Sequence, residues 1–208
     1  MTSGRSAAIR EAFDTSVARF LQTVTDVGDG DWDIPVSDEW TVHQLVAHVV
    51  RGMGVMADYL DADPAVPGEL LPGASAYFRS TLDMEGIHTG IADRAIAAAG
   101  TDGGDPLAWA HDVAGSTRLL VAATADDVVI VHFAGAIGFL DYLETRICEL
   151  VLHTLELQVA CGLEPEVPVE ALTVVNQVLL ELVDRAEPLA LALALSGRSG
   201  PRACNVLG

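Results

Sequence analysis

The sequence predicts a mostly α-helical protein, with one helical domain over residues 1–188 and a C-terminal strand or arm over residues 189–208. Apolar residues make up 50% of the 208 residues, so a chain of this length can bury a sizeable core. Aromatic residues make up only 5%, so we expect a core of Ala, Val and Leu, which suits packed helices better than aromatic-rich strands. Apolar residues also recur at steps of three and four along several long stretches, which is the period of amphipathic helices.

The first half of the chain contains two helical patterns. Residues 5–25 carry apolar residues at helical spacing and are expected to form the first helix. The second helix is expected to begin at Thr41, because Thr41 and Gln44 have the spacing of a capping box. Its apolar stripe continues to Leu60, and the stretch 61–72, rich in Asp and Pro, is expected to be a loop.

The second half predicts four further helices and one extended segment. Residues 75–99 and 106–123 are both expected to be helical. The segment DDVVIVHFAG at 126–135 is short and β-branched, so it predicts a strand-like connector. The strongest helical pattern covers 138–161, and a last helix is expected over 169–187, before a proline.

Charge and cysteine content exclude several classes of function. Asp and Glu total 30 against 11 Lys and Arg, and a net charge of −19 repels nucleic acid and anionic lipid. The three cysteines form no C-x-x-C pair, which argues against a disulfide framework, and Cys148 is expected in the core. No export or transmembrane segment is recognised, so we expect a cytoplasmic protein that binds neither nucleic acid nor membranes.

The helix over 138–161 carries a candidate pair of metal ligands. Glu149 and His153 are four residues apart, so their side chains leave the same face of the helix one turn apart. A carboxylate and an imidazole placed in this way can share a metal ion with a facing helix. The alternative is that this polar stripe is the solvent-facing side of an otherwise apolar helix.

His48 is the candidate third ligand. It lies at the edge of the apolar face of the helix that begins at Thr41, and Gly52 leaves space one turn further on. The alternative is a core histidine bonded to a backbone carbonyl, with Gly52 serving close helix packing. Two histidines and one glutamate suit zinc, although nickel accepts the same donors, and three protein ligands leave a fourth position for water or substrate.

The other polar candidates are weaker. Arg146 lies one turn before Glu149, where it could orient that carboxylate, bind an anionic substrate group or form a surface ion pair. His43 is expected to be exposed near a helix start. Surface or loop positions are expected for three further histidines, His88, His111 and His132. The sequence contains no phosphate loop, dinucleotide fingerprint or G-x-S-x-G motif.

Two segments carry a family resemblance. DEWTVHQLVAHVVRG (38–52) and DYLETRICELVLHTLEL (141–157) resemble the two signatures of the mycothiol-dependent maleylpyruvate isomerase family, N-terminal domain type. That family belongs to the DinB-like superfamily of metal-binding four-helix bundles. The resemblance implies this fold, with short extra helices, and implies His48, Glu149 and His153 as the metal ligands.

The chain departs from the family pattern in two respects. The second signature usually ends in Asp-Leu, whereas this chain has Glu156 followed by leucine. The full maleylpyruvate isomerase also carries a further C-terminal domain that contributes to its active site, and we expect little or none of it here. The resemblance therefore implies the metal site more strongly than it implies the isomerase reaction.

Two functions follow as hypotheses. In the first, a divalent metal, zinc or alternatively nickel, activates a low-molecular-weight thiol, expected to be mycothiol. The thiol attacks an electrophilic substrate in a transferase or isomerase reaction, and Arg146 or Tyr142 orients a substrate anion. In the second, the bundle binds a metal or small ligand without catalysis, which a closed metal site would favour. The sequence leaves the oligomeric state open, with a homodimer as one alternative.

Overall fold

The structure is a computed structural model that describes residues 2–36, 40–61, 70–132 and 134–186 of the chain. The arm expected at 189–208 lies outside these ranges, as does most of the loop expected at 61–72. The described residues are mostly helical, as the sequence predicts. Among the described helices, none is both long and apolar enough to cross a membrane.

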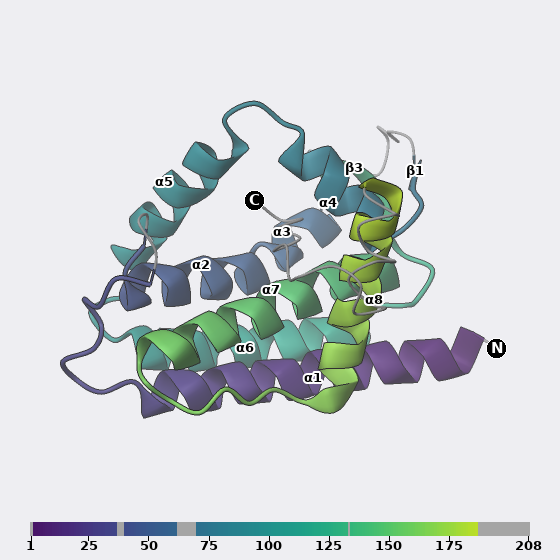
Figure 1. The fold of residues 1–208 in the computed structure, drawn as a ribbon. Coiled ribbons are helices and arrows are strands. Elements are labelled where there is room, and N and C mark those ends of the chain that lie inside the picture. The colour runs from purple at the N-terminus through teal and green to yellow at the C-terminus, as the bar shows by residue number, and fades with distance from the viewer. Residues whose placement is uncertain (1, 37–39, 62–69, 133, 187–208) are drawn as a thin grey trace, which may run out of the picture.

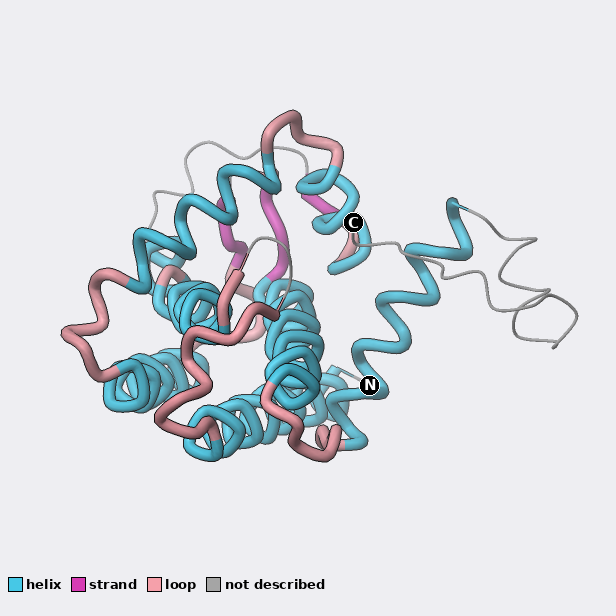
Figure 2. The backbone as a smooth tube through the Cα atoms, turned by 60° about the vertical axis from the view of Figure 1, so that its left-hand side comes forward, coloured by secondary structure: helices cyan, strands magenta, loops and turns pink. Residues whose placement is uncertain are grey.

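Four helices form the bundle that the family resemblance implies. Helix α1 packs against α6 and α7, and α2 packs against the same two helices, which closes the bundle. Figure 2 looks nearly along the helices of this bundle. The bundle helices are α1 (Thr2–Asp26), α2 (Val42–Gly54), α6 (Pro106–Ala123) and α7 (Phe139–Ala160).

Four further helices of the described residues surround the bundle. Helix α8 crosses α1 and α7 steeply at one end (Figure 1), and it packs against both of them. Helix α5 packs against α2, and α4 packs against α7 and α8. These surrounding helices are α3 (Met56–Asp61), α4 (Ala74–Leu82), α5 (Ile87–Ala99) and α8 (Val169–Ala186).

A small sheet joins α6 to α7. Strands β2 (Val129–His132) and β3 (Gly135–Gly138) pair antiparallel, and β1 (Leu70–Leu71) lies parallel to β3 on its other side. The extended connector expected at 126–135 is therefore observed as the first strand of a hairpin. Strand β1 falls in the stretch expected to be a loop, since two residues give no recognisable strand pattern.

Two helices expected to be continuous are interrupted. The single helix expected at 75–99 is wrong, because α4 and α5 are separated by a turn in which Gly86 adopts a left-handed conformation (φ 74°). The helix expected from Thr41 to Leu60 is divided at Val55 into α2 and α3. The poor helix propensity of Gly52 and Gly54 just before this break accounts for it.

The core has the composition that the sequence predicts, with one addition. Most of its buried apolar residues are Ala, Val and Leu. Aromatic residues are few, but four of them are among the largest fully buried side chains: Phe13, Phe20, Phe139 and Tyr142. These rings fill space that smaller aliphatic side chains leave between the helices.

Candidate metal centre

The capping box of α2 fixes the start of the helix that carries His48. The Thr41 hydroxyl oxygen accepts a hydrogen bond from the Gln44 N–H at 3.4 Å, and the Gln44 side-chain oxygen accepts one from the Thr41 N–H at 3.0 Å. The apolar face that follows is buried in the core. His48 lies at the edge of this face with a side chain only 16% exposed, and it points towards α7.

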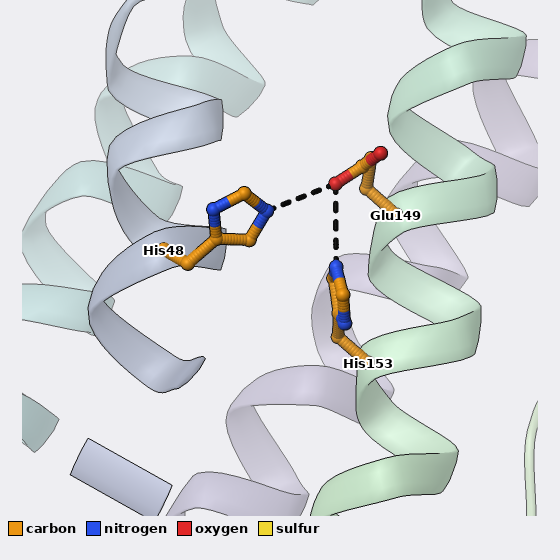
Figure 3. A group of neighbouring side chains, drawn as sticks. All are labelled: His48, Glu149 and His153. Carbon is orange, nitrogen blue, oxygen red and sulfur yellow. Dashed lines mark hydrogen bonds and ion pairs between the residues drawn. The ribbon is translucent and has the colours of Figure 1, made fainter. Parts of the chain in front are cut away.

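Glu149 and His153 meet His48 from the facing helix α7 (Figure 3). Glu149 Oε2 lies 3.1 Å from His48 Nε2 and 3.3 Å from His153 Nε2. The two imidazole rings lie edge to face, with centroids 5.0 Å apart. The structure therefore brings together the three side chains that the sequence pattern and the family resemblance both single out.

The spacing of these donor atoms fits a divalent ion. Zinc bonds of about 2.0–2.2 Å place tetrahedral ligand atoms about 3.4 Å apart. Both separations from Glu149 Oε2 are close to that value, and all three donor atoms lie within 4.8 Å of one another. We call His48, Glu149 and His153 the candidate triad.

Two residues outside the candidate triad hold its histidines in place. Glu156 Oε2 lies 2.7 Å from His153 Nδ1, so the carboxylate holds the proton on Nδ1 and leaves Nε2 to face Glu149. Trp40 stacks on His48, with ring centroids 4.8 Å apart and planes inclined by 29°. Both rotamers are thereby fixed before any ligand binds.

The charges of the candidate triad are strongly coupled. Burial alone would raise the pKa of Glu149, yet hydrogen bonds from His153 and His48 and the charge of Arg146 hold it well below its usual value. Burial alone would lower the pKa of His153, but Glu149 and Glu156 raise it to about 9. For His48, burial outweighs Glu149 and lowers the pKa. Without an ion, the candidate triad therefore holds an ionised Glu149, a protonated His153 and a neutral His48 at pH 7.

A cavity of about 260 Å³ lies beside the candidate triad, between α2, α4, α5 and α7. His48 and Glu149 line part of it. Gly52 lines it too, so the space expected beside His48 is part of this cavity. The two residues expected to orient a substrate, Arg146 and Tyr142, also line it. The Arg146 guanidinium lies over the Tyr142 ring, 5.0 Å from its centroid. We call this space the α2–α7 cavity.

Residues 7–158 match the family model described as the mycothiol maleylpyruvate isomerase N-terminal domain. The chain belongs to this family. The match covers the whole bundle from most of α1 to almost the end of α7, and it includes the candidate triad. Neither the curated proteins nor the solved structures contain a match to the chain.

Sequence reasoning misplaced His132. It was expected at the surface or in a loop, but it is 8% exposed and lines the α2–α7 cavity. The Ala134 N–H donates to His132 Nδ1 at 3.2 Å, and Tyr77 Oη lies 3.3 Å from His132 Nε2. Burial, helped by the charges of Arg146 and Arg94, lowers the pKa of His132 to about 3, so the ring is neutral.

Two other histidines, His43 and His111, lie away from the candidate triad. His43 was expected to be exposed, but its side chain is partly buried and its Nε2 lies 2.6 Å from Asp102 Oδ2. His111 is exposed on α6, as expected. Cys148 is buried in α7, as expected for a small core residue. A long-range pair such as His43–Asp102 leaves no signal in the spacing of a single sequence.

Proposed function

We propose that this chain is a metal-dependent enzyme that uses a low-molecular-weight thiol, mycothiol, in a transferase or isomerase reaction. The observation that carries the proposal is that two members of the candidate triad, His48 and Glu149, line a cavity large enough for a small molecule. A purely structural metal site would be closed by a fourth protein ligand. The family description, which names mycothiol and maleylpyruvate isomerase, supports the same type of chemistry.

The proposed ligands of the ion are His48, Glu149 and His153. Zinc is the expected ion and nickel the alternative, since both accept two imidazoles and a carboxylate. A bound ion would supply Lewis-acid chemistry, which lowers the pKa of a coordinated thiol and polarises a carbonyl. Glu156 keeps His153 Nε2 directed at the ion position, and Trp40 keeps the His48 ring in place.

Arg146 and Tyr142 are proposed to orient the electrophilic substrate. Arg146 presents a fixed positive charge to the cavity one turn before Glu149, and it can hold an anionic group of the substrate. Burial raises the pKa of Tyr142, so its hydroxyl stays protonated and can donate a hydrogen bond. The proposed reaction takes place in the cytoplasm, where a reducing environment keeps small thiols and the free cysteines Cys148 and Cys161 reduced.

A thiol titration of zinc-loaded protein tests this proposal. We expect a thiol to bind the zinc-loaded wild type, with a change in the spectrum of the cobalt-substituted form, and to support turnover of an electrophile. Glu149→Gln should lose metal and thiol-dependent turnover together, because a neutral amide is a poor zinc ligand. Glu11→Gln, which makes the same change at an exposed position of α1, should retain both. A zinc-loaded wild type that binds no thiol and turns over no electrophile would instead indicate a non-catalytic metal-binding bundle.

A further inference from the structure

The wall of the α2–α7 cavity holds a histidine and a tyrosine to which the proposed function assigns no role. His132 ends β2 and Tyr77 lies on α4, so they come from separate elements. They are only 8% and 5% exposed, and both line the cavity. Their ring centroids lie 5.0 Å apart, and the Tyr59 ring packs edge to face on His132. Packing on this scale holds both polar groups in one orientation beside the cavity.

The backbone fixes which ring nitrogen of His132 carries the proton. The Ala134 N–H donates to His132 Nδ1 at 3.2 Å, and a backbone amide can only donate, so Nδ1 presents a lone pair. Burial, helped by the charges of Arg146 and Arg94, lowers the pKa of His132 to about 3, so the ring is neutral at pH 7. A neutral imidazole with a lone pair on Nδ1 carries its single ring proton on Nε2.

This tautomer sets the direction of the Tyr77 hydroxyl. Tyr77 Oη lies 3.3 Å from His132 Nε2, so the Nε2–H donates and the phenol oxygen accepts. The Tyr77 proton therefore points away from His132. Thr81, one turn along α4, is close enough to affect the pKa of Tyr77, but its Oγ1 has no hydrogen-bond partner of normal geometry among the described residues. The Tyr77 O–H is thus left as a donor for a ligand in the cavity.

The surroundings of Tyr77 suit a donor to a negatively charged oxygen. Burial raises the pKa of Tyr77, so its hydroxyl stays protonated. The Arg146 guanidinium lies 6.0 Å from the centroid of the Tyr77 ring and adds a fixed positive charge. A fixed donor beside a positive charge, in a site with little water, is the arrangement that stabilises an oxygen on which charge develops.

We propose that Tyr77 is a catalytic residue whose hydroxyl donates a hydrogen bond to the substrate oxygen that becomes negative, and that His132 is the positioning residue that directs this hydroxyl. In the thiol reaction, the thiolate sulfur bonds to the electrophilic carbon, the π bond of the electrophile breaks and its electron pair moves to that oxygen. The catalytic role rests on the proposed function, whereas the orientation of the donor requires neither thiol nor metal.

Nitrogen NMR of the wild-type protein tests the role of His132 without any ligand. With isotope-labelled histidine, His132 should show one protonated and one unprotonated ring nitrogen between pH 5 and pH 8, with the proton on Nε2. The signal that disappears in His132→Gln identifies the ring. A proton on Nδ1, or a ring that gains a second proton in this range, would overturn the proposal.

Absorption titration of the metal-stripped full chain with para-nitrophenolate tests the donor. A hydrogen bond to the phenolate oxygen moves the absorption band to shorter wavelength, so the bound probe should show this blue shift at pH 8. Tyr77→Phe should weaken binding by about tenfold or more and reduce the shift, because hydrogen bonds to a charged acceptor are among the strongest. Tyr59→Phe makes the same change at another tyrosine of the cavity and should leave the Kd and the shift unchanged.

Two variants of His132 separate positioning from packing. His132→Gln keeps an N–H that can donate to Tyr77 Oη, so it should retain much of the blue shift of the bound probe. His132→Leu has no such donor and should show a shift as small as that of Tyr77→Phe. Equal shifts in the two variants of His132 would refute its positioning role.

Thiol-dependent turnover tests the catalytic role. Tyr77→Phe should lower kcat by about 10²-fold with little change in KM, because the hydrogen bond is strongest in the transition state. A raised KM with unchanged kcat would overturn this role. A wild type that binds no para-nitrophenolate, or binds it no more tightly than Tyr77→Phe does, would overturn the donor itself. A wild type that shows the blue shift but no turnover would retain the oriented donor and refute the proposed function.

Discussion

Replacing Glu156 with Gln should weaken zinc binding, although Glu156 is not one of the three proposed ligands. Glu156 Oε2 lies 2.7 Å from His153 Nδ1 and orients the ring so that Nε2 faces Glu149. The amide oxygen of Gln can still accept a hydrogen bond from Nδ1, so this variant removes the charge but keeps the tautomer. The affinity falls because an imidazole with a neutral partner is a weaker donor to the ion.

The size of this effect follows from the exposure of Glu156. Changes to a partner of a metal-binding histidine cost about 10- to 100-fold in metal affinity. The Glu156 side chain is 52% exposed, so water screens its charge and we expect about a tenfold loss, at the lower end of that range. Glu156→Ala also removes the hydrogen bond to His153, so this variant should lose more zinc affinity than Glu156→Gln.

The Kd of zinc can be measured at pH 7 by competition between the metal-stripped protein and a zinc indicator. Glu11→Gln is the matched control, because it makes the same change of charge at an exposed position of α1. The reasoning would be refuted if Glu156→Gln and Glu11→Gln changed the Kd equally. It would also be refuted if Glu156→Ala bound zinc as tightly as the wild type.

Three further predictions concern stability. Burial alone would lower the pKa of His153, but Glu149 and Glu156 raise it from 6.5 to about 9. The protonated His153 should therefore stabilise the metal-free protein most below pH 6.5. Its free energy of unfolding should fall by up to roughly 3 kcal/mol by pH 9. Urea unfolding across this range measures the loss, and a flat profile would contradict the coupling. Thr41→Ala should lower the free energy of unfolding by about 1 kcal/mol because it removes the capping box, whereas Thr41→Ser should keep it. Equal unfolding temperatures for the two variants would refute this. Gly52→Ala should raise the free energy of unfolding by about 1 kcal/mol, because Ala has the better helix propensity. The added Cβ fits, since its nearest atom lies at an ordinary contact distance of 3.5 Å. A fall in the unfolding temperature would indicate a clash instead.

Local sequence signals predicted the parts of the structure that depend on neighbouring residues. The capping box of Thr41 and Gln44 located the start of α2, and the four-residue spacing of Glu149 and His153 placed both on one face of α7. The two family signatures then joined these helices, which periodicity alone could not do. His48 is an example, since its position on the helix was equally compatible with a core histidine.

The features that sequence reasoning missed depend on the tertiary packing. Gly86 interrupts a helical pattern that is otherwise continuous, and it is left-handed in the turn over residues 83–86 that separates α4 from α5. His132 ends a four-residue strand, and it is buried because Tyr59 and Tyr77 from other elements pack against its ring. Arg51, Arg94 and Arg146 come together around the α2–α7 cavity because of how three helices pack. The spacing of these residues along the chain carries no trace of it.

Metal content is the most direct measurement of the central claim, that the candidate triad binds a divalent ion. Elemental analysis of protein purified without chelator should find close to one divalent ion per chain. His153→Ala should lose most of it, whereas His111→Ala, at an exposed position of α6, should retain it. A wild-type protein that stays metal-free after incubation with zinc and with nickel would contradict the claim, as would a His153→Ala variant that carries as much metal as the wild type.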